Sequence, residues 1–262
     1  AGLLTLPAIS VLESRVNPAD PIALFHARRK VEAELGRLLT HHISAVLARH
    51  STPADTVPES AEADMRRTVG GRALLNRLLS LAVADCDVSA IEFAAAQVHD
   101  QNMTLSQGAL AAGNNRPTTV RETVLAAFHD RWQDNALVLE KWFSFESMSS
   151  ISGRIERLEQ LMQHPAFDPN NPNKLRVVLG AFMSGNPVRF YAADGSGFEF
   201  IADCLVDIDK RNPQLAARMV LPLTRMGSYG HTRQRQMRRA LERLQMAAPS
   251  TDLGEVIEKA LA

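Results

Sequence analysis

The sequence predicts an all-α fold, and three general properties indicate this. Apolar residues make up 45% of the 262 residues, whereas aromatic residues make up only 5%. Leucine and alanine dominate the apolar set, and both favour helices, while β-rich folds depend on β-branched and aromatic side chains. Apolar residues also recur at mixed spacings of three and four along almost the whole chain, which is the period of amphipathic helices.

A long amphipathic helix is expected over residues 21–50, with an interruption near Gly36. Its apolar stripe consists of Leu24, Phe25, Val31, Leu35, Leu38, Leu39, Ile43, Val46 and Leu47. A connector rich in Pro, Ser and Thr follows at residues 51–64. A second stripe then predicts another helix, and it consists of Met65, Val69, Leu74, Leu75, Leu78, Leu79 and Val83.

Local signals mark further helix starts in the second half of the chain. Three Asn-Pro pairs each precede an apolar-periodic segment: Asn171-Pro172, Asn186-Pro187 and Asn212-Pro213. The asparagine side chain accepts a hydrogen bond from the exposed N–H groups of the first turn, and proline at the first helical position has no N–H to leave unpaired. Thr119 and Glu122 have the spacing of a capping box, which predicts another start near residue 118.

The expected helices are short and closely spaced. Their starts lie near residues 88, 104, 118, 136, 152, 173, 187, 196, 213, 231 and 252. Pairs of such helices form units of roughly 35 to 45 residues, the size of HEAT or armadillo hairpins, although no consensus repeat is visible. Because short connections make sequence neighbours pack antiparallel, an irregular α-solenoid or superhelix of antiparallel helix hairpins is favoured over a closed bundle.

Charge, cysteine content and hydropathy exclude several classes of protein. The formal net charge is zero, so no whole-molecule field attracts nucleic acid or an anionic membrane. Cys86 and Cys204 lie far apart and form no CxxC pair, which fits a reducing cytoplasm better than a disulfide scaffold. No apolar run approaches the roughly 20 residues of a membrane span, and the first residues lack the basic start of a signal peptide. The chain does not begin with Met, which suggests either processing or a domain of a longer protein.

The stretch Asp194-Gly195-Ser196-Gly197 suggests a catalytic loop but fits no catalytic template. A nucleophile elbow requires glycine two residues on either side of the serine, where this chain has Asp194 and Phe198. A phosphate-binding loop requires Gly-Lys-Ser/Thr, which is absent. We therefore expect a turn that begins a helix over residues 198–208, with Asp194 and Ser196 as capping side chains.

Histidine spacing does not predict a metal site. His41, His42 and His50 share one expected helix, but the His-Glu-x-x-His string of helical zinc sites is absent. The remaining histidines stand singly in different segments, at His26, His99, His129, His164 and His231. No metal ligand and no catalytic residue is therefore assigned in this chain.

An arginine-rich segment is the strongest local charge feature. It contains Arg218, Arg225, Arg233, Arg235, Arg238, Arg239 and Arg243. Such a set is able to contact phosphates, but tyrosine is scarce and no nucleic-acid-binding module is present. A solvated helix face, or an interface to another domain or to a carboxylate-bearing ligand, is favoured over nucleic-acid binding.

Several long motifs occur in a distinctive order. Residues 164–225 contain the strings NPNKLR, GAF, DGSG and RNPQLAAR, and upstream lie NMTLSQGALAA, HDRWQDNALVLEKWF and LTLPAISVLESRVNPADPIAL. These segments resemble, in the same order, the end of bacterial aminopeptidase N, a family of gluzincin-type zinc aminopeptidases. The resemblance covers essentially the whole chain.

The resemblance implies that residues 1–262 form a single C-terminal helical superhelix domain of a larger enzyme. The family combines an N-terminal β domain, a thermolysin-like catalytic domain, a small β-sandwich and this helical domain. The family's catalytic strings, Gly-x-Met-Glu-Asn and His-Glu-x-x-His with a distal Glu, are absent here. The zinc is thus expected in the full-length enzyme, the partner is the catalytic domain of the same polypeptide, and the chain alone is expected to be inactive.

The resemblance also implies a role in substrate access. In the family, the helical domain closes over the catalytic domain and limits which peptides enter the internal chamber. Arg176, in NPNKLR, and Arg218, in NPQLAAR, match family arginines that face this chamber, where a guanidinium is able to pair with the C-terminal carboxylate of a peptide substrate. The alternative is a freestanding HEAT-like scaffold that binds a protein or nucleic acid through the arginine-rich segment.

Overall fold

The computed structural model describes residues 2–50, 68–116, 119–151 and 155–262. Within these residues, the regular structure is helical, and the sole extended pairing is a parallel bridge between Ala19 and Tyr229. The prediction of an all-α fold is therefore confirmed. The chain separates into two compact units: unit 1 comprises residues 1–6 and 26–145, and unit 2 comprises residues 7–25 and 146–262.

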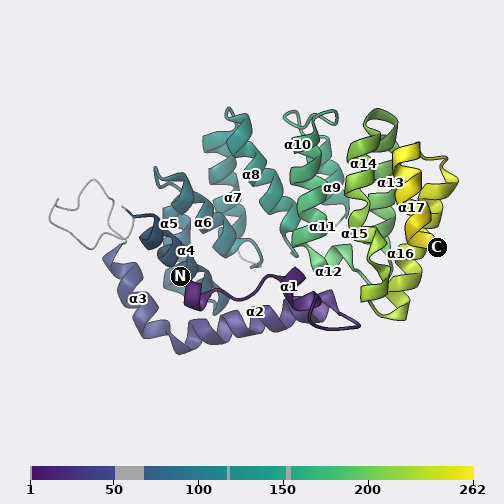
Figure 1. Ribbon diagram of the computed structural model, residues 1–262. Helices are drawn as coiled ribbons and strands as arrows, with labels where there is room; N and C mark the ends of the chain where they lie inside the picture. The colour runs from purple at the N-terminus through teal and green to yellow at the C-terminus, as the bar shows by residue number, and fades with distance from the viewer. Residues whose placement is uncertain (1, 51–67, 117–118, 152–154) are drawn as a thin grey trace. The chain divides into compact units, whose positions relative to one another are not determined.

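Unit 1 is built from helices joined by short connections. They are η1 (Gly2–Leu4), the C-terminal part of α2 (Pro21–Leu38), α3 (Thr40–Arg49), α4 (Val69–Ala84), α5 (Val88–Gln97), α6 (Met103–Gly113), α7 (Thr119–Trp132) and most of α8 (Ala136–Met148). Helices α4, α5, α6 and α7 pack side by side (Figure 1). Their facing side chains, such as Leu75, Leu105 and Phe128, are excluded from solvent and form the core of this unit.

Unit 2 is also built from helices, many of them short, and it includes the first residues of α2 and the end of α8. They are α1 (Ile9–Glu13), α9 (Ile155–Met162), α10 (Pro172–Leu175), the π-helical turn η3 (Arg176–Gly180), α11 (Ala181–Gly185), α12 (Pro187–Phe190), α13 (Ser196–Arg211), α14 (Pro213–Met219), α15 (Leu221–Thr224), η4 (Met226–Ser228), α16 (His231–Met246) and α17 (Thr251–Leu261). Helix α13 packs on α14 and α16, and α17 packs on α14 and α16 (Figure 1). Stacked helix hairpins of this kind are those of an α-solenoid.

The first long helix is interrupted at Leu39, which confirms the predicted break, but Gly36 does not cause it. Leu39 leaves the helical region with φ −101° and ψ 6°, and Thr40 Oγ1 donates back to the Gly36 and Arg37 carbonyls at 3.0 and 2.9 Å. Gly36 lies inside α2, where a Cβ atom would overlap the Leu81 carbonyl of α4. This glycine therefore permits close helix packing and does not end the helix.

The three Asn-Pro pairs begin helices as predicted. Asn171 Oδ1 accepts from the Asn173 N–H at 2.9 Å, Asn186 Oδ1 from the Arg189 N–H at 3.3 Å, and Asn212 Oδ1 from the Leu215 N–H at 3.0 Å. The other predicted starts agree with the observed ones within one residue. The start predicted near residue 152 lies outside the described residues, which resume at Ile155 inside α9. The connector at residues 51–64, Met65 and the side chain of Thr119 lie outside the described residues.

The caps at Asn186 and Asn212 are expected to differ in energetic weight. Asn212→Ala should lower the free energy of unfolding by about 1 kcal/mol, the usual value for a lost N-cap. Asn186 is fully buried, and its Nδ2 also donates to the Ser147 and Ser149 carbonyls at 3.3 and 2.8 Å. Asn186→Ala should therefore cost about 2 kcal/mol or more. Urea unfolding of both variants tests this, and equal losses would contradict it.

Candidate functional site

Arg176 lies at the surface of unit 2, where α10 passes into the π-helical turn η3. The buried side chains of Leu175, Val178 and Leu179 fix this segment in the core. The exposed guanidinium donates from Nη1 to Asn173 Oδ1 at 3.2 Å, within the same turn. A π-helical turn inside a helix is frequent at functional sites, so the local geometry presents Arg176 to solvent without a carboxylate partner of its own.

Arg218 is exposed on α14, whose residues Leu215, Ala216 and Met219 are buried. Within the described part of the chain, its guanidinium has no hydrogen-bond or ion-pair partner, and no polar contact joins it to Arg176. Each of the two arginines predicted to bind substrate is thus presented separately, from a helix that begins at an Asn-Pro cap. Their role toward a peptide stays a prediction.

The other members of the arginine-rich segment are engaged within unit 2. Arg243 Nη2 lies 2.6 Å from Asp203 Oδ1, and Arg233 Nη2 lies 2.9 Å from Asp20 Oδ1. The remaining partners are Glu13 for Arg225, Glu199 for Arg239, Thr232 for Arg235 and the Leu261 carbonyl for Arg238. Because these guanidiniums already have acceptors within the protein, the arrangement indicates a solvated face with ion pairs. It does not favour a surface that binds nucleic-acid phosphates.

The stretch from Asp194 to Gly197 is a turn that begins α13, as predicted. Asp194 Oδ1 accepts from the Ser196 N–H at 3.0 Å and from Ser196 Oγ at 2.7 Å. These hydrogen bonds hold the pKa of the Asp194 carboxyl below its usual range. Gly195, at the N-cap position, has φ +80°, a left-handed conformation that favours glycine. Ser196 is the first residue of α13 and its hydroxyl donates to Asp194, so the prediction that its side chain caps the helix is wrong.

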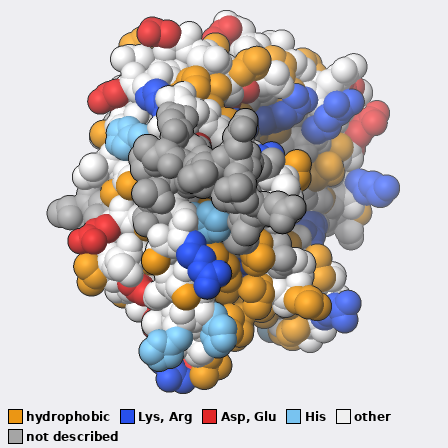
Figure 2. All heavy atoms as spheres, turned by 90° about the vertical axis from the view of Figure 1, so that its left-hand side faces the viewer, with side chains coloured by type: hydrophobic (Ala, Val, Ile, Leu, Met, Phe, Trp, Pro, Cys, Tyr) orange, Lys and Arg blue, Asp and Glu red, His pale blue; other side chains and the backbone are white. Residues whose placement is uncertain are grey.

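The described residues do not fit a zinc ion. Among them, no group of three or more His, Cys, Asp or Glu side chains is arranged to hold a metal. Figure 2 shows one side of the molecule, on which histidine, acidic and basic side chains are interspersed with hydrophobic ones. No step of zinc chemistry is therefore assigned to the residues that the structure describes.

Two further properties concern the state of the cysteines and the hydropathy of the helices. Cys86 is exposed and Cys204 is half-buried, and both are free thiols. Burial and the neighbouring carboxylates raise the pKa of Cys204 to about 12, so this thiol is a poor nucleophile near neutral pH. Among the helices that the structure describes, none combines the length and apolar character that a bilayer crossing requires.

A buried tyrosine pair in unit 2 lies beside the segment around Ala19, which forms a backbone bridge with Tyr229. The hydroxyls of Tyr191 and Tyr229 lie 2.8 Å apart, and the Ala19 N–H donates to the Ser228 carbonyl at 2.8 Å. Burial raises the pKa of Glu13 and of both tyrosines. Because both phenols stay protonated at neutral pH, this arrangement is structural.

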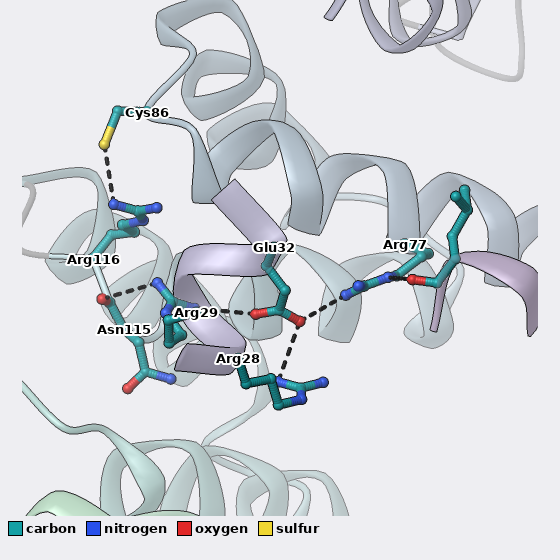
Figure 3. Close-up of polar contacts among 8 residues, drawn as sticks. Arg28, Arg29, Glu32, Arg77, Cys86, Asn115 and Arg116 are labelled. Atoms are coloured by element: carbon teal, nitrogen blue, oxygen red, sulfur yellow. Dashed lines mark hydrogen bonds and ion pairs between the residues drawn. The ribbon is translucent and has the colours of Figure 1, made fainter. Parts of the chain in front are cut away.

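A polar cluster in unit 1 was not predicted from the sequence. We call it the Glu32 cluster, and it consists of Arg28, Arg29, Glu32, Arg77, Cys86, Asn115 and Arg116 (Figure 3). The buried Glu32 carboxylate lies at its centre. Glu32 Oε1 lies 2.9 Å from Arg77 Nη1 and 3.2 Å from Arg28 Nη1, and Glu32 Oε2 lies 4.0 Å from Arg29 Nη1.

Arg29 and Arg116 form the outer edge of this cluster. Arg29 Nη2 donates to the Asn115 carbonyl at 3.4 Å, and Arg116 Nη1 lies 3.1 Å from the Cys86 sulfur (Figure 3). Burial, and then the neighbouring Arg116 charge, lower the pKa of Arg29. Two buried guanidinium nitrogens in the cluster, Arg77 Nη2 and Arg116 Nε, have no hydrogen-bond acceptor.

Comparisons with known proteins agree with this fold. A family model described as "Domain of unknown function (DUF3458_C) ARM repeats" matches residues 1–262. The chain is 34% identical over 265 residues to aminopeptidase N of Escherichia coli (strain K12) and 33% identical over 272 residues to aminopeptidase N of Caulobacter vibrioides. Each alignment covers 100% of this chain and 30% of the relative.

A solved structure agrees as well. The crystal structure of Legionella pneumophila aminopeptidase A in complex with aspartic acid matches with a TM-score of 0.84 and 27% identity, over 99% of this chain and 31% of that one. The family model matches residues 1–262, and the stacked helix hairpins agree with it. The chain therefore belongs to the DUF3458_C family of ARM-repeat domains. Its relatives are aminopeptidases, and the predicted resemblance to the C-terminal domain of aminopeptidase N is confirmed. The chain spans about 30% of the length of these curated relatives.

Proposed function

We propose that residues 1–262 act as one helical domain of a larger cytoplasmic zinc aminopeptidase, an enzyme that removes N-terminal residues from peptides. Support comes from similarity to aminopeptidases over the whole of this chain but only 30% of theirs. The catalytic domain of the same polypeptide is the proposed partner and supplies the zinc. The free thiols of Cys86 and Cys204 fit a reducing compartment.

Within that enzyme, the proposed role of this domain is to enclose the active-site chamber, limit access to it and help bind the peptide. The observation that carries this proposal is the exposed Arg218 guanidinium, which has no partner in the described residues, while the other arginines of its segment are engaged. An unpaired guanidinium keeps its whole donor fork for a carboxylate. One charge-assisted contact of this kind contributes about 1.5 to 3 kcal/mol.

Arg218→Ala in the full-length enzyme is expected to raise KM about tenfold for short peptides with a free C-terminal carboxylate, because about 1.4 kcal/mol corresponds to a factor of ten. The kcat should not change, since the contact exists in both ground and transition states. The same peptides with a C-terminal amide should show the same KM in variant and parent enzyme. Arg176→Ala tests the second predicted residue in the same assay.

Arg235→Ala is the matched control, because Arg235 is also exposed but donates to Thr232 on its own helix. Its KM should equal that of the parent enzyme for both peptide series. An unchanged KM in Arg218→Ala would remove Arg218 from substrate binding. The 262-residue chain alone, supplied with zinc, should not hydrolyse aminoacyl amides, and measurable turnover would place catalysis within this chain.

A further inference from the structure

The Glu32 cluster carries more positive charge than its own carboxylate neutralises. Arg28, Arg29 and Arg77 all pair with Glu32, so three guanidiniums share one carboxylate. Arg116 adds a fourth, and it contacts the Cys86 thiol, which is a weak acceptor. Figure 3 shows Arg28 and Arg77 converging on Glu32 from one side, while Arg29 and Arg116 lie on the other.

The contacts of Arg29 and Arg116 are weaker than those of Arg77. Arg29 reaches its two acceptors at 3.4 and 4.0 Å, near the outer limits for a hydrogen bond and an ion pair. Arg77, in contrast, donates to the Leu4 carbonyl at 2.8 Å and to Glu32 at 2.9 Å. The Arg77 guanidinium is thus held by good acceptors, whereas the guanidiniums of Arg29 and Arg116 are not.

The outer pair also places like charges side by side. The side chain of Arg29 is 23% exposed, and the Arg116 charge contributes to lowering its pKa. Repulsion between partly desolvated cations is relieved when an anion lies between them. The Nε atom of Arg116 is buried without an acceptor, and a polar group of this kind is costly unless a water or ligand satisfies it.

We propose that Arg29 and Arg116 form a binding site for an oxyanion. Carboxylate and phosphate share the required chemistry, because each presents two or more oxygens to the planar forks of arginine. Glu32 pairs with Arg77 and Arg28 next to the site, and the Asn115 carbonyl accepts a hydrogen bond from Arg29 and so orients it. This site lies in unit 1, whereas Arg176 and Arg218 lie in unit 2, so the proposal stands apart from the proposed substrate contacts.

The test titrates the chain with inorganic phosphate, with succinate and with sodium chloride at equal ionic strength, by thermal unfolding and calorimetry. At least one of the two oxyanions should raise Tm saturably, whereas chloride should not. The oxyanion with the lower Kd identifies the class of ligand. If neither oxyanion binds saturably, or if chloride produces the same Tm rise, the proposal is wrong.

Variants locate the site. Arg29→Gln and Arg116→Gln should each weaken binding at least about tenfold, the loss expected for one charge-assisted contact. Arg37→Gln is the matched control, because Arg37 is on the same helix, exposed, and paired with Glu34. Its affinity should equal that of the parent chain. If the parent chain, Arg29→Gln, Arg116→Gln and Arg37→Gln all bind the oxyanion with equal affinity, the oxyanion binds elsewhere and the assignment is wrong.

Cys86 provides an independent local readout, because its sulfur lies 3.1 Å from Arg116 Nη1 and is exposed. An oxyanion held by Arg116 should slow alkylation of Cys86 by neutral iodoacetamide at saturating concentration. The slowing should disappear in Arg116→Gln. Cys204 should not interfere, since its pKa is raised to about 12. Alkylation of the parent chain that does not respond to a bound oxyanion would contradict the proposed position.

Discussion

Gly197→Ala is expected to lower the free energy of unfolding by about 3 kcal/mol or more. A Cβ atom at this position would overlap the Arg189 carbonyl oxygen and would lie 2.5 Å from the Phe190 carbonyl oxygen and 2.7 Å from Phe190 Cα. These are backbone atoms of α12, so no side-chain rotation relieves the overlap. Either α12 or the first turn of α13 must move.

Movement of α12 is costly because Phe190 is a core residue. Its side chain has no solvent exposure, and its ring packs edge-to-face on Phe198 at 5.2 Å and on Phe182 at 5.9 Å between centroids. Displacing Phe190 would disturb these contacts together. The added methyl group therefore acts on the packing of α11, α12 and α13 at once.

Gly254→Ala is the matched control for this prediction. Gly254 lies inside α17, and a Cβ atom there would meet Pro249 Cγ at 3.7 Å, an ordinary contact. This substitution should stabilise the chain by up to about 1 kcal/mol, because alanine favours a helix over glycine. Urea unfolding of both variants measures the difference. Similar free energies for the two would mean that α12 and α13 do not approach as closely as the structure shows.

Most helix starts could be predicted from the sequence, because the residues that begin each helix are neighbours in the chain. An asparagine followed by proline contains its own acceptor and its own fixed φ, so Asn171, Asn186 and Asn212 needed no tertiary information. Gly36 was misinterpreted because the reason for a glycine there is the distant Leu81 carbonyl. A glycine inside a helix has the same local signature whether it ends the helix or admits a neighbour.

The Glu32 cluster shows why the candidate site was only partly predictable. Arg28, Arg29 and Glu32 have the spacing of helical ion pairs, so that part was open to sequence reasoning. Arg77 and Arg116 reach the same place only through tertiary packing. Arg176 and Arg218 were identified through resemblance, and their proposed roles stay predictions.

Glu32→Gln is expected to lower the free energy of unfolding by about 3 kcal/mol, because removing one member of a buried ion pair is strongly destabilising. The Glu32 side chain is only 7% exposed, and three arginines share its carboxylate. Glu34→Gln is the control on the same helix, since Glu34 is 55% exposed and pairs with Arg37 at the surface. Its stability should equal that of the parent chain.

The same variant connects stability with the proposed oxyanion site. A ligand that binds only the folded state stabilises it by about 2.7 kcal/mol at a concentration of one hundred times Kd. Phosphate or succinate at saturating concentration should therefore restore part of the Tm lost in Glu32→Gln. If Glu32→Gln were as stable as Glu34→Gln, the guanidiniums would be satisfied by solvent alone, and the charge imbalance that motivates the oxyanion site would carry no energy.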